Sequence, residues 1–409
     1  MNVNISIGID ARFLLRPLRG IPLYVLRICE ILPSLNRNYQ FYYFINKGFE
    51  HNDNPDNYLP RLNEIEKNNS NVIIVNYDDD SEVKWEQIYL PNLIKKYKID
   101  LLHMPSNRIS FFTRVPTIIT LHDVIEYKNL NINFLKNIFI ESGNIRIFFY
   151  HLRMFAYIWA NYKFGIHRAS HIITVSKYSA MEINQTLNIQ KRKITSIYHG
   201  LDDDFIVKSE AGSDINGYEL HSRNFVLMLG GDSHHKNPEG AIASWAKVPE
   251  PIRRKFPLKI IGFLGGGNSP LLTALNDFNL RDQVEIKGWV TREELIDHMR
   301  SAALFIYLSR YEGFGFPPLH AMASGTPVVA SNRTSIPEIL DNVGYKFDPA
   351  DHEGVAKEIV TLLSDAALWK EQSDAGIIRS RMFSWAISSH DHLNVYQRVI
   401  EDFINGYSL

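Results

Sequence analysis

The sequence predicts an α/β protein with two domains, each built on a parallel sheet flanked by helices. Short apolar strands alternate with helical patterns from Asn4 to Val175, and the same alternation restarts at Phe225. Such alternation is typical of parallel sheets, whose ligands bind beyond the carboxyl ends of the strands. The 409 residues are too many for one ordinary core. They suit two domains of about 200 residues each.

The predicted strands are short apolar or β-branched runs that end in polar residues. The first series is Asn4–Ile9, Tyr39–Ile45, Val72–Asn76, Leu101–Met104, Thr117–Leu121 and His171–Val175. The second series is Phe225–Leu229, Leu258–Ile261, Val284–Lys287, Leu304–Leu308 and Thr326–Ala330. An apolar-periodic helix is expected from about Leu23 to Leu32, after a turn at Gly20.

The break between the two series predicts the domain boundary. Residues 208–223 are polar and contain two glycines, which is typical of a linker. We therefore expect a first domain over residues 1–207 and a second over residues 224–382. An amphipathic helix over residues 383–409 ends the chain, and its pattern alone fits a place on either domain.

The composition favours a globular protein and argues against several other classes. Hydrophobic residues make up 45% of the chain, which is too many for a disordered protein. Lys and Arg number 44 against 45 acidic residues, so no global field favours nucleic acid. A single cysteine, Cys29, permits no intrachain disulfide and favours a reducing compartment. No signal peptide or run of about 18 apolar residues is found, so we expect a cytoplasmic protein.

The most informative segment surrounds Glu312, which follows the predicted strand Leu304–Leu308. Gly313 and Gly315 permit positive φ and a close approach of backbone to a ligand. Pro317 and Pro318 suit the first turn of a helix, whose N-terminal N–H groups and dipole favour an anion. The segment predicts an anion-binding strand–loop–helix, although an ordinary structural unit with glycine turns fits the same local pattern.

This segment resembles the donor-binding signature of retaining glycosyltransferases of family GT4, a GT-B-fold group that includes many bacterial mannosyltransferases. The resemblance implies two Rossmann-like domains facing a cleft, with the C-terminal helix crossing back to the first domain. Members carry two glutamates separated by seven residues. Glu312 matches the first, which contacts the transferred sugar, and His320 stands where the second holds the nucleotide ribose.

A second motif, residues 230–237, lies between a predicted strand and a helix, where glycine backbone and Lys236 can meet a diphosphate. The resemblance gives Lys236 the role of neutralising the leaving diphosphate. Gly231 stands near the place of a family arginine, so one expected cation is either absent or supplied by His235. Trp289 resembles the segment that meets the nucleotide base, and a core position is the alternative. The remaining predicted donor-site residues are Gly313, Phe314, Gly315 and Phe316.

Two features of the first domain also match the family. His122 ends a predicted strand, and similar members place this histidine beside the transferred sugar; a structural histidine is the alternative. The turn at Gly20 resembles the glycine-rich loop that borders acceptor and diphosphate, with Pro22 and Leu23 replacing its usual glycine and arginine. The resemblance therefore implies Glu312 and Lys236 as catalytic residues together with His122.

Two other segments suggest further binding sites. The acidic triplets at 78–80 and 202–204 follow strands, and we interpret them as solvated turns, so no metal site is predicted. Residues 138–164 are rich in aromatic side chains with interspersed basic ones. They fit either a core helix or an interfacial helix that binds a lipid-linked acceptor at the inner face of the membrane.

The resemblance thus implies a metal-independent hexosyltransferase of bacterial surface polysaccharide synthesis, such as O-antigen or lipopolysaccharide, with no cofactor. The donor is expected to be GDP-mannose, with UDP- and dTDP-sugars as alternatives, and the acceptor a saccharide or a lipid-linked saccharide. Two rival hypotheses are a catalytically silent nucleotide-sugar-binding subunit and a GT-B-type sugar-nucleotide epimerase.

Overall fold

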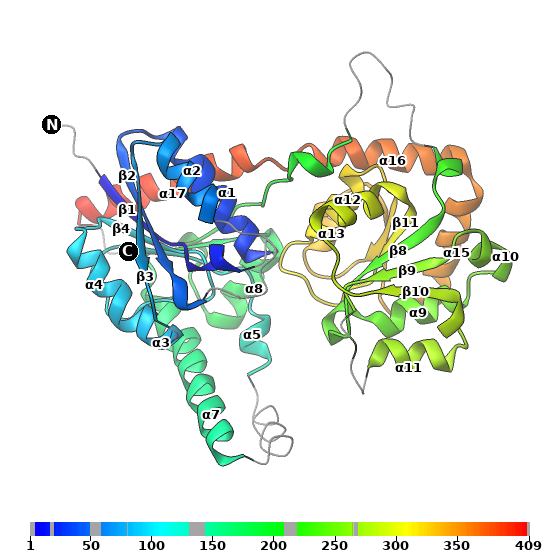
Figure 1. The fold of residues 1–409 in the computed structure, drawn as a ribbon, viewed down its shortest axis with the longest axis horizontal. Helices are drawn as coiled ribbons and strands as arrows, with labels where there is room; N and C mark the ends of the chain where they lie inside the picture. The colour runs from blue at the N-terminus through cyan, green and yellow to red at the C-terminus, as the bar shows by residue number, and fades with distance from the viewer. Residues whose placement is uncertain are drawn as a thin grey trace. The chain divides into compact units, whose positions relative to one another are not determined.

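The computed structural model describes residues 5–16, 20–49, 59–79, 81–130, 144–207, 219–263, 265 and 269–406 (Figure 1). The chain forms two compact units. Unit 1 comprises Met1–His199 with Trp385–Leu409, and unit 2 comprises Gly200–Ser384.

Unit 1 contains a seven-stranded parallel sheet in the order β3-β2-β1-β4-β5-β6-β7. Its strands are β1 (Ile5–Asp10), β2 (Tyr39–Asn46), β3 (Val72–Tyr77), β4 (Leu101–Met104), β5 (Thr117–Thr120), β6 (His171–Thr174) and β7 (Ile194–Ser196). The central strands β4, β5 and β6 are buried along their whole length, as expected where helices cover both faces of a parallel sheet. The structure confirms the six predicted strands and adds β7, whose three residues are too few for a sequence signal.

The helices of unit 1 connect these strands. They are α1 (Ile21–Leu35), α2 (Leu59–Asn68), α3 (Glu82–Lys84), α4 (Leu90–Lys96), α5 (Ile125–Lys128), α7 (Ile145–Ala160), α8 (Lys177–Leu187) and α17 (Trp385–Ile404). Helix α1 begins after Gly20, whose φ of 56° favours glycine, and extends beyond the predicted range at both ends.

The C-terminal helix α17 packs against α1 and β6 and therefore belongs to unit 1. This confirms the predicted return of the chain to the first domain. Within unit 2, the segments that leave and rejoin unit 1 lie side by side, because the Leu201 N–H donates to the Phe383 carbonyl at 3.0 Å.

Unit 2 contains a six-stranded parallel sheet in the order β10-β9-β8-β11-β12-β13. Its strands are β8 (Phe225–Leu229), β9 (Leu258–Ile261), β10 (Val284–Lys287), β11 (Ala302–Tyr307), β12 (Val328–Ser331) and β13 (Tyr345–Phe347). Its helices are α9 (Pro238–Ala246), α10 (Glu250–Lys255), α11 (Pro270–Asp277), α12 (Arg292–Ser301), α13 (Phe316–Ala323), α14 (Ile336–Leu340), α15 (His352–Ser364) and α16 (Ala366–Ser380). Helix α9 packs on α11 and α15, and α13 packs on α12 and α16, so the helices flank the sheet in two groups.

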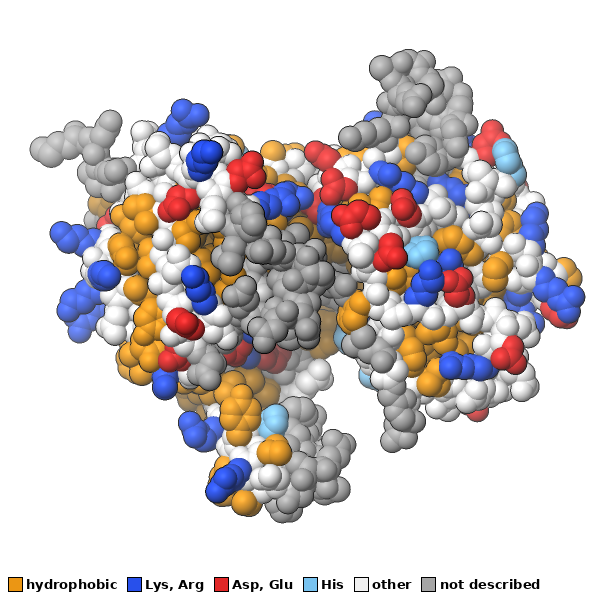
Figure 2. Space-filling model, in the orientation of Figure 1, with side chains coloured by type: hydrophobic (Ala, Val, Ile, Leu, Met, Phe, Trp, Pro, Cys, Tyr) orange, Lys and Arg blue, Asp and Glu red, His pale blue; other side chains and the backbone are white. Residues whose placement is uncertain are grey.

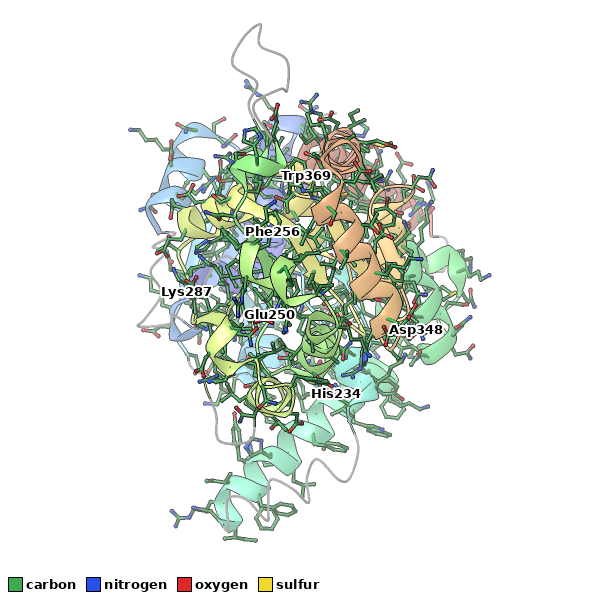
Figure 3. All side chains as sticks on the ribbon, turned by 90° about the vertical axis from the view of Figure 1, so that its right-hand side faces the viewer. His234, Glu250, Phe256, Lys287, Asp348 and Trp369 are labelled. Carbon is green, nitrogen blue, oxygen red and sulfur yellow. The ribbon has the colours of Figure 1, made fainter. Side chains whose placement is uncertain are left out.

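The core of unit 2 explains how its outer helices are held. Trp369 on α16 is fully buried, and its indole N–H donates to the Ala303 carbonyl at 2.5 Å (Figure 3). Phe256 and Trp245 belong to the same apolar cluster. Together they fix a rigid sheet whose carboxyl edge carries the loops discussed below.

The division into units follows His199, which is earlier than the boundary expected from composition. Residues 200–207 belong to unit 2 because they pack on it: the Val207 N–H donates to the Ala323 carbonyl at 3.1 Å, and the Phe205 ring stacks on His320. Of the predicted linker, residues 208–218 lie outside the described residues.

Candidate functional site

The loops after β8 and β11 bring two of the predicted catalytic residues together. These strands are hydrogen-bonded neighbours at the centre of the unit 2 sheet. Lys236 Nζ donates to Glu312 Oε1 at 2.7 Å and to the Tyr307 hydroxyl at 2.8 Å. The lysine therefore joins the ends of both strands. An ammonium has three N–H donors, and the described contacts use two of them.

One carboxylate oxygen of Glu312 receives all the hydrogen bonds that fix this side chain. The Tyr307 hydroxyl lies 2.7 Å from Oε1 and the Ser309 hydroxyl 2.5 Å from the same atom. Within the described residues, no hydrogen bond reaches Oε2. The Glu312 side chain is 13% exposed, so a ligand hydroxyl can approach an acceptor that is already oriented. Burial and the neighbouring carboxylate raise the pKa of Tyr307, which keeps its hydroxyl protonated as a donor.

The glycine-rich loop after Glu312 is supported from the following loop. The Glu312 N–H donates to Thr334 Oγ1 at 3.0 Å, and the Ser335 hydroxyl donates toward the carbonyls of Glu312 at 3.0 Å and Phe314 at 2.6 Å. Gly315 caps α13 with a φ of 122°, a conformation that other residues rarely adopt. These contacts hold a sharp turn at the start of α13.

The start of α13 offers fewer N–H donors than an ordinary helix end. Pro317 and Pro318 occupy its first turn and carry no N–H. The backbone N–H groups nearest this end therefore belong to the loop before Pro317. The helix dipole still favours an anion at this place, so the predicted anion site rests on the loop more than on the helix itself.

The loop after β8 requires glycine for packing reasons. A Cβ at Gly231 would lie 2.9 Å from the Gly262 carbonyl oxygen, because this loop passes close to the loop after β9. No larger residue fits here without a backbone shift, which explains why an arginine is absent. A 3₁₀ turn, His234–Lys236, follows and aims Lys236 toward β11.

The side chains flanking Lys236 differ in exposure and charge. His235 is half-buried, and burial followed by the charge of Lys236 lowers its pKa, so the neutral ring is favoured near pH 7. Of the two predicted diphosphate-binding cations, Lys236 and His235, the lysine therefore supplies the positive charge.

Trp289 is 58% exposed, which rules out the alternative that it belongs to the core. Its ring lies beside Gly262, at the same edge of the sheet.

His320 is used for packing and is 8% exposed. Its ring stacks on Phe205 with centroids 3.8 Å apart and planes 4° apart. Burial lowers the pKa of His320 to about 3, so the ring is neutral at physiological pH. Its Nε2 is buried and has no hydrogen-bond partner within the described residues.

In unit 1, His122 lies directly after β5 and is 8% exposed. Its Nε2 lies 3.3 Å from the Pro105 carbonyl, which can only accept, so Nε2 carries the hydrogen. Burial lowers the pKa of His122 to about 4. Its ring packs edge-on against Tyr24 at 5.3 Å, so the side chain also has a structural use. Gly20 is exposed, and residue 19 of its turn lies outside the described residues.

The sequence did not single out the residues that orient Glu312. Tyr307 falls within the predicted strand Leu304–Leu308, and the sequence pattern assigns Ser309 no role. Both positions carry a usable signal, because hydroxyl side chains at and just after the carboxyl end of a central strand face the ligand edge of a parallel sheet. The loop after β12 gave no such signal, because Thr334 and Ser335 are common turn residues.

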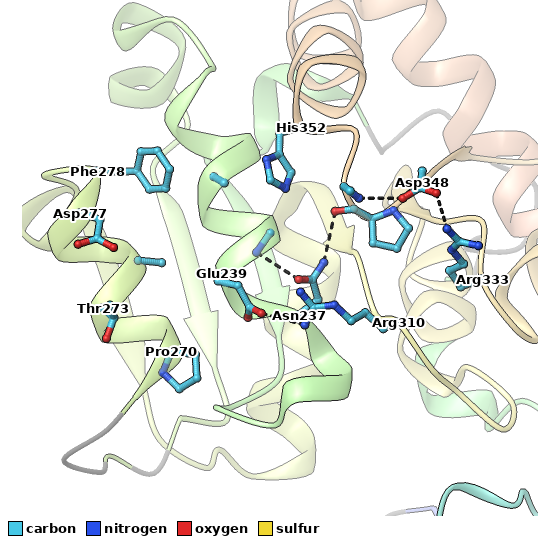
Figure 4. A pocket seen from close by; sticks show the side chains of 15 residues that line it. Asn237, Glu239, Pro270, Thr273, Asp277, Phe278, Arg310, Arg333, Asp348 and His352 are labelled. Carbon is cyan, nitrogen blue, oxygen red and sulfur yellow. Dashed lines mark hydrogen bonds and ion pairs between the residues drawn. The ribbon is translucent and has the colours of Figure 1, made fainter. Parts of the chain in front are cut away.

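A separate pocket of about 910 Å³ lies beside this cluster, between α9, α11 and the loops after β11, β12 and β13 (Figure 4). Neither Lys236 nor Glu312 lines it. Four of its charged residues form two ion pairs, since Arg310 lies 2.8 Å from Glu239 and Arg333 contacts Asp348. Both arginines are therefore neutralised, and we place the candidate site at the hydrogen-bonded Lys236–Glu312 pair instead.

Two further searches concern the described residues only. They contain no group of three or more His, Cys, Asp or Glu side chains arranged to hold a metal ion. No described helix is both long and apolar enough to cross a membrane. Two of the three acidic residues of the second triplet form ion pairs: Arg292 lies 2.5 Å from Asp202 and 3.2 Å from Asp204. Asp80 of the first triplet and Gly266–Gly267 lie outside the described residues.

Comparison with protein families matches both halves of the chain. A model described as Glycosyl transferases group 1 matches residues 215–378, and one described as Glycosyltransferase Family 4 matches residues 20–205. Together the two models cover most of the chain.

Curated relatives include two Escherichia coli proteins. The O-antigen chain mannosyltransferase B is 31% identical over 57% of this chain and 62% of its own length. The serotype-specific mannosyltransferase WbdA is 26% identical over 70% of this chain and 34% of its own length. The chain thus spans less than two thirds of either relative. Among solved structures, Anabaena Alr3699/HepE in complex with UDP and glucose has a TM-score of 0.63 at 17% identity, with 96% of this chain and all of that chain covered.

Proposed function

Because this chain belongs to the GT-B-fold glycosyltransferases, we propose that it transfers a sugar from a nucleotide-diphosphate donor to a hydroxyl of a saccharide acceptor. Mannose is the favoured sugar and GDP-mannose the favoured donor, because the curated relatives above are named mannosyltransferases. The UDP bound by the structural neighbour keeps a UDP-sugar as an alternative.

The observation that carries this proposal is the pair formed by Lys236 and Glu312. Lys236 has one N–H left for a phosphate oxygen, and Glu312 has one oxygen left for a sugar hydroxyl. Placing a cation where the leaving diphosphate gains charge is the largest electrostatic contribution that this site offers to the reaction. Glu312 orients the sugar through Oε2 while Oε1 stays held by Tyr307 and Ser309.

We infer transfer with retention, as in the family that the chain resembles. The glycosidic C–O bond to the diphosphate breaks, the acceptor oxygen bonds to the same carbon from the same face, and a donor phosphate oxygen takes the acceptor proton. His122 contacts the sugar as a neutral ring, since burial lowers its pKa. The reaction is proposed to need no metal, so transfer should continue in EDTA.

The remaining predicted residues complete the donor site. Trp289, exposed at the edge of the sheet, meets the nucleotide base. His320 stands in place of the family carboxylate at the ribose, as a neutral ring stacked on Phe205. Gly231 and the loop over Gly313–Phe316 provide close backbone approach, and Gly20 borders the acceptor. We place the enzyme in the cytoplasm, in bacterial surface polysaccharide synthesis.

The test separates diphosphate binding from sugar transfer. Purified protein is screened by thermal shift with GDP-, UDP- and dTDP-sugars, and the stabilising donor is then used for turnover and for titration of its nucleoside diphosphate. Lys236→Ala should lower turnover by about 10²–10³ and weaken diphosphate binding by about tenfold. Glu312→Gln should lower turnover similarly but leave diphosphate affinity equal or higher, because Lys236 loses its anionic partner.

Exposed residues of the same unit provide matched controls. Lys247→Ala and Glu353→Gln alter a surface ion pair on α9 and α15 and should change neither quantity. Stabilisation by no nucleotide sugar, or unchanged turnover in Lys236→Ala, would refute the proposed function. If the protein binds a donor but neither transfers its sugar nor hydrolyses it, the silent binding subunit is favoured. The packing role of His320 is compatible with that candidate.

A further inference from the structure

The described contacts that anchor helix α7 to the rest of unit 1 lie at its C-terminal turns. The Gln87 side chain donates to the Tyr157 hydroxyl at 2.8 Å, and Tyr157 also bonds Glu86. Asn161, just after the helix, accepts the Ile109 N–H at 2.8 Å, and Ile158 packs on the apolar core. Toward its N-terminus the helix extends away from the sheet (Figure 1), and it contains no buried residue.

Large apolar side chains are exposed along this helix at an unusual density. Of the eighteen exposed large hydrophobic residues of the described chain, six fall within residues 145–164. They are Ile145, Ile147, Phe149, Tyr150, Trp159 and Phe164. Single exposed hydrophobic residues are normal in soluble proteins, whereas a concentrated group marks an interaction surface.

Helical spacing arranges most of the apolar surface as one stripe. Ile145, Phe149, Leu152, Ala156 and Trp159 are separated by four, three, four and three residues, so they share one face of α7. We call these five residues the α7 stripe. Its first two members are 56% and 54% exposed. The stripe is therefore open to a partner at the end farthest from the anchored turns.

Basic side chains run beside the stripe, and acidic ones are absent from this part of the sequence. Arg146 and Arg153 each follow a stripe residue by one position, on the adjoining face. Residues 144–168 also contain Lys163 and Arg168 but no Asp or Glu, although the whole chain is nearly neutral. Figure 2 shows hydrophobic and basic side chains on this helix. The local charge complements an anionic surface.

We propose that α7 docks on the surface of an anionic lipid bilayer, with the α7 stripe in the headgroup–acyl boundary and the arginines at the phosphates. Sixteen residues of helix are about 24 Å long, which is short of a hydrocarbon core, so α7 lies along the interface. Long arginine side chains can bury their stems beside the stripe while their charges stay among the headgroups. This inference does not depend on the proposed sugar transfer.

The test is flotation of the full chain with vesicles of phosphatidylcholine, with or without phosphatidylglycerol. The chain should float with the anionic vesicles and much less with the neutral ones, and salt should weaken binding. Arg146→Gln with Arg153→Gln should weaken binding roughly 25-fold, at about fivefold for each basic residue. Ile145→Ser with Phe149→Ser should reduce binding by at least about tenfold, since both side chains leave the interface.

Two control pairs match these changes elsewhere on the surface. Ile378→Ser with Met382→Ser alters an apolar pair of similar exposure and the same four-residue spacing, with Ile378 on α16 and Met382 just after its end, and Lys95→Gln with Lys96→Gln removes two exposed charges on α4. Neither control should change flotation. Circular dichroism and nucleotide binding report whether each variant is folded, independently of lipid.

Three results would overturn the proposal. One is no flotation of the folded chain with anionic vesicles. Another is equal loss of flotation in the control pairs. The third is a lipid-free dimer, measured by light scattering, that the Ile145/Phe149 variant converts to a monomer, because the stripe would then be an interface between two copies.

Discussion

Replacing Tyr24 with Phe should weaken the attachment of α17 within unit 1. The Tyr24 hydroxyl lies 2.7 Å from His392 Nε2 and 2.8 Å from Thr120 Oγ1. His392 Nδ1 lies 2.7 Å from the Ser388 carbonyl, which only accepts, so Nδ1 carries the hydrogen of the neutral ring. Nε2 must then accept from Tyr24, and the Tyr24 oxygen must accept from Thr120.

The same donor-to-acceptor order continues to a second buried histidine, His103. Because Thr120 donates to Tyr24, its oxygen accepts from His103 Nε2 at 2.7 Å. His103 Nδ1 is left as an acceptor and receives the Tyr396 hydroxyl at 2.5 Å. Tyr396 and His392 both belong to α17, so one chain of hydrogen bonds leaves this helix, crosses β4, β5 and α1, and returns to it. All its side chains are buried.

The loss in free energy of unfolding follows from the two hydrogen-bond partners that the substitution leaves unpaired. Phe keeps the packing of the ring but leaves the His392 acceptor and the Thr120 donor unpaired, at about 1–3 kcal/mol for each buried group. We expect a loss of about 2–4 kcal/mol, in the lower part of the summed range, because the Thr120 hydroxyl can rotate. Urea unfolding measures the total, and hydrogen exchange in α1 and α17 assigns it to unit 1.

Tyr150→Phe is the matched control, because it removes a hydroxyl from a side chain that is 61% exposed. Its free energy of unfolding should stay within about 0.5 kcal/mol of the parent. Equal stability of Tyr24→Phe and the parent chain, with unchanged exchange in α17, would show that the Tyr24 hydroxyl does not hold α17 in place.

Two further predictions concern stability. Burial lowers the pKa of both His122 and His392 to about 4, below about 6.5 in an unfolded chain, so the unfolded state binds more protons between these values. The free energy of unfolding should therefore be constant above about pH 6.5 and fall toward pH 4, by about 3 kcal/mol per histidine; urea titrations at pH 7 and pH 4.5 with equal midpoints would contradict this. Gly231→Ala places a Cβ 2.9 Å from the Gly262 oxygen and should destabilise unit 2 by about 1–3 kcal/mol in the same assay. Gly288→Ala, with its nearest contact at 3.5 Å, should be close to neutral, and equal effects of the two would refute the packing argument.

The sheets could be predicted from the sequence because their strands are buried on both faces. Runs such as Leu304–Leu308 must be apolar throughout in a parallel sheet, and this leaves a strong signal. The domain division was harder, because the polar segment that indicates a linker begins only at residue 208, after residues 200–207 have already joined unit 2. Their attachment to unit 2 depends on tertiary contacts, such as Phe205 on His320, that have no local pattern.

The candidate site was predictable in part for a related reason. Glu312 and Lys236 lie in glycine-containing loops that follow central strands, and such loops face ligands in parallel sheets. The hydrogen bonds that hold Glu312 by one oxygen come from Tyr307 and Ser309, whose spacing to Glu312 matches no common motif. Only the folded loop shows that the carboxylate is oriented before a ligand arrives.

The residue at position 320 is consistent with its surroundings. A carboxylate there would be buried and would lie in the field of Asp202, which acts on His320 in the folded unit. Both effects disfavour a negative charge, and Arg292, which acts on His320 in the opposite sense, is already paired with Asp202 and Asp204. A neutral ring avoids this cost and fills the space by stacking on Phe205. The departure from the family pattern therefore removes the charge from the proposed ribose contact.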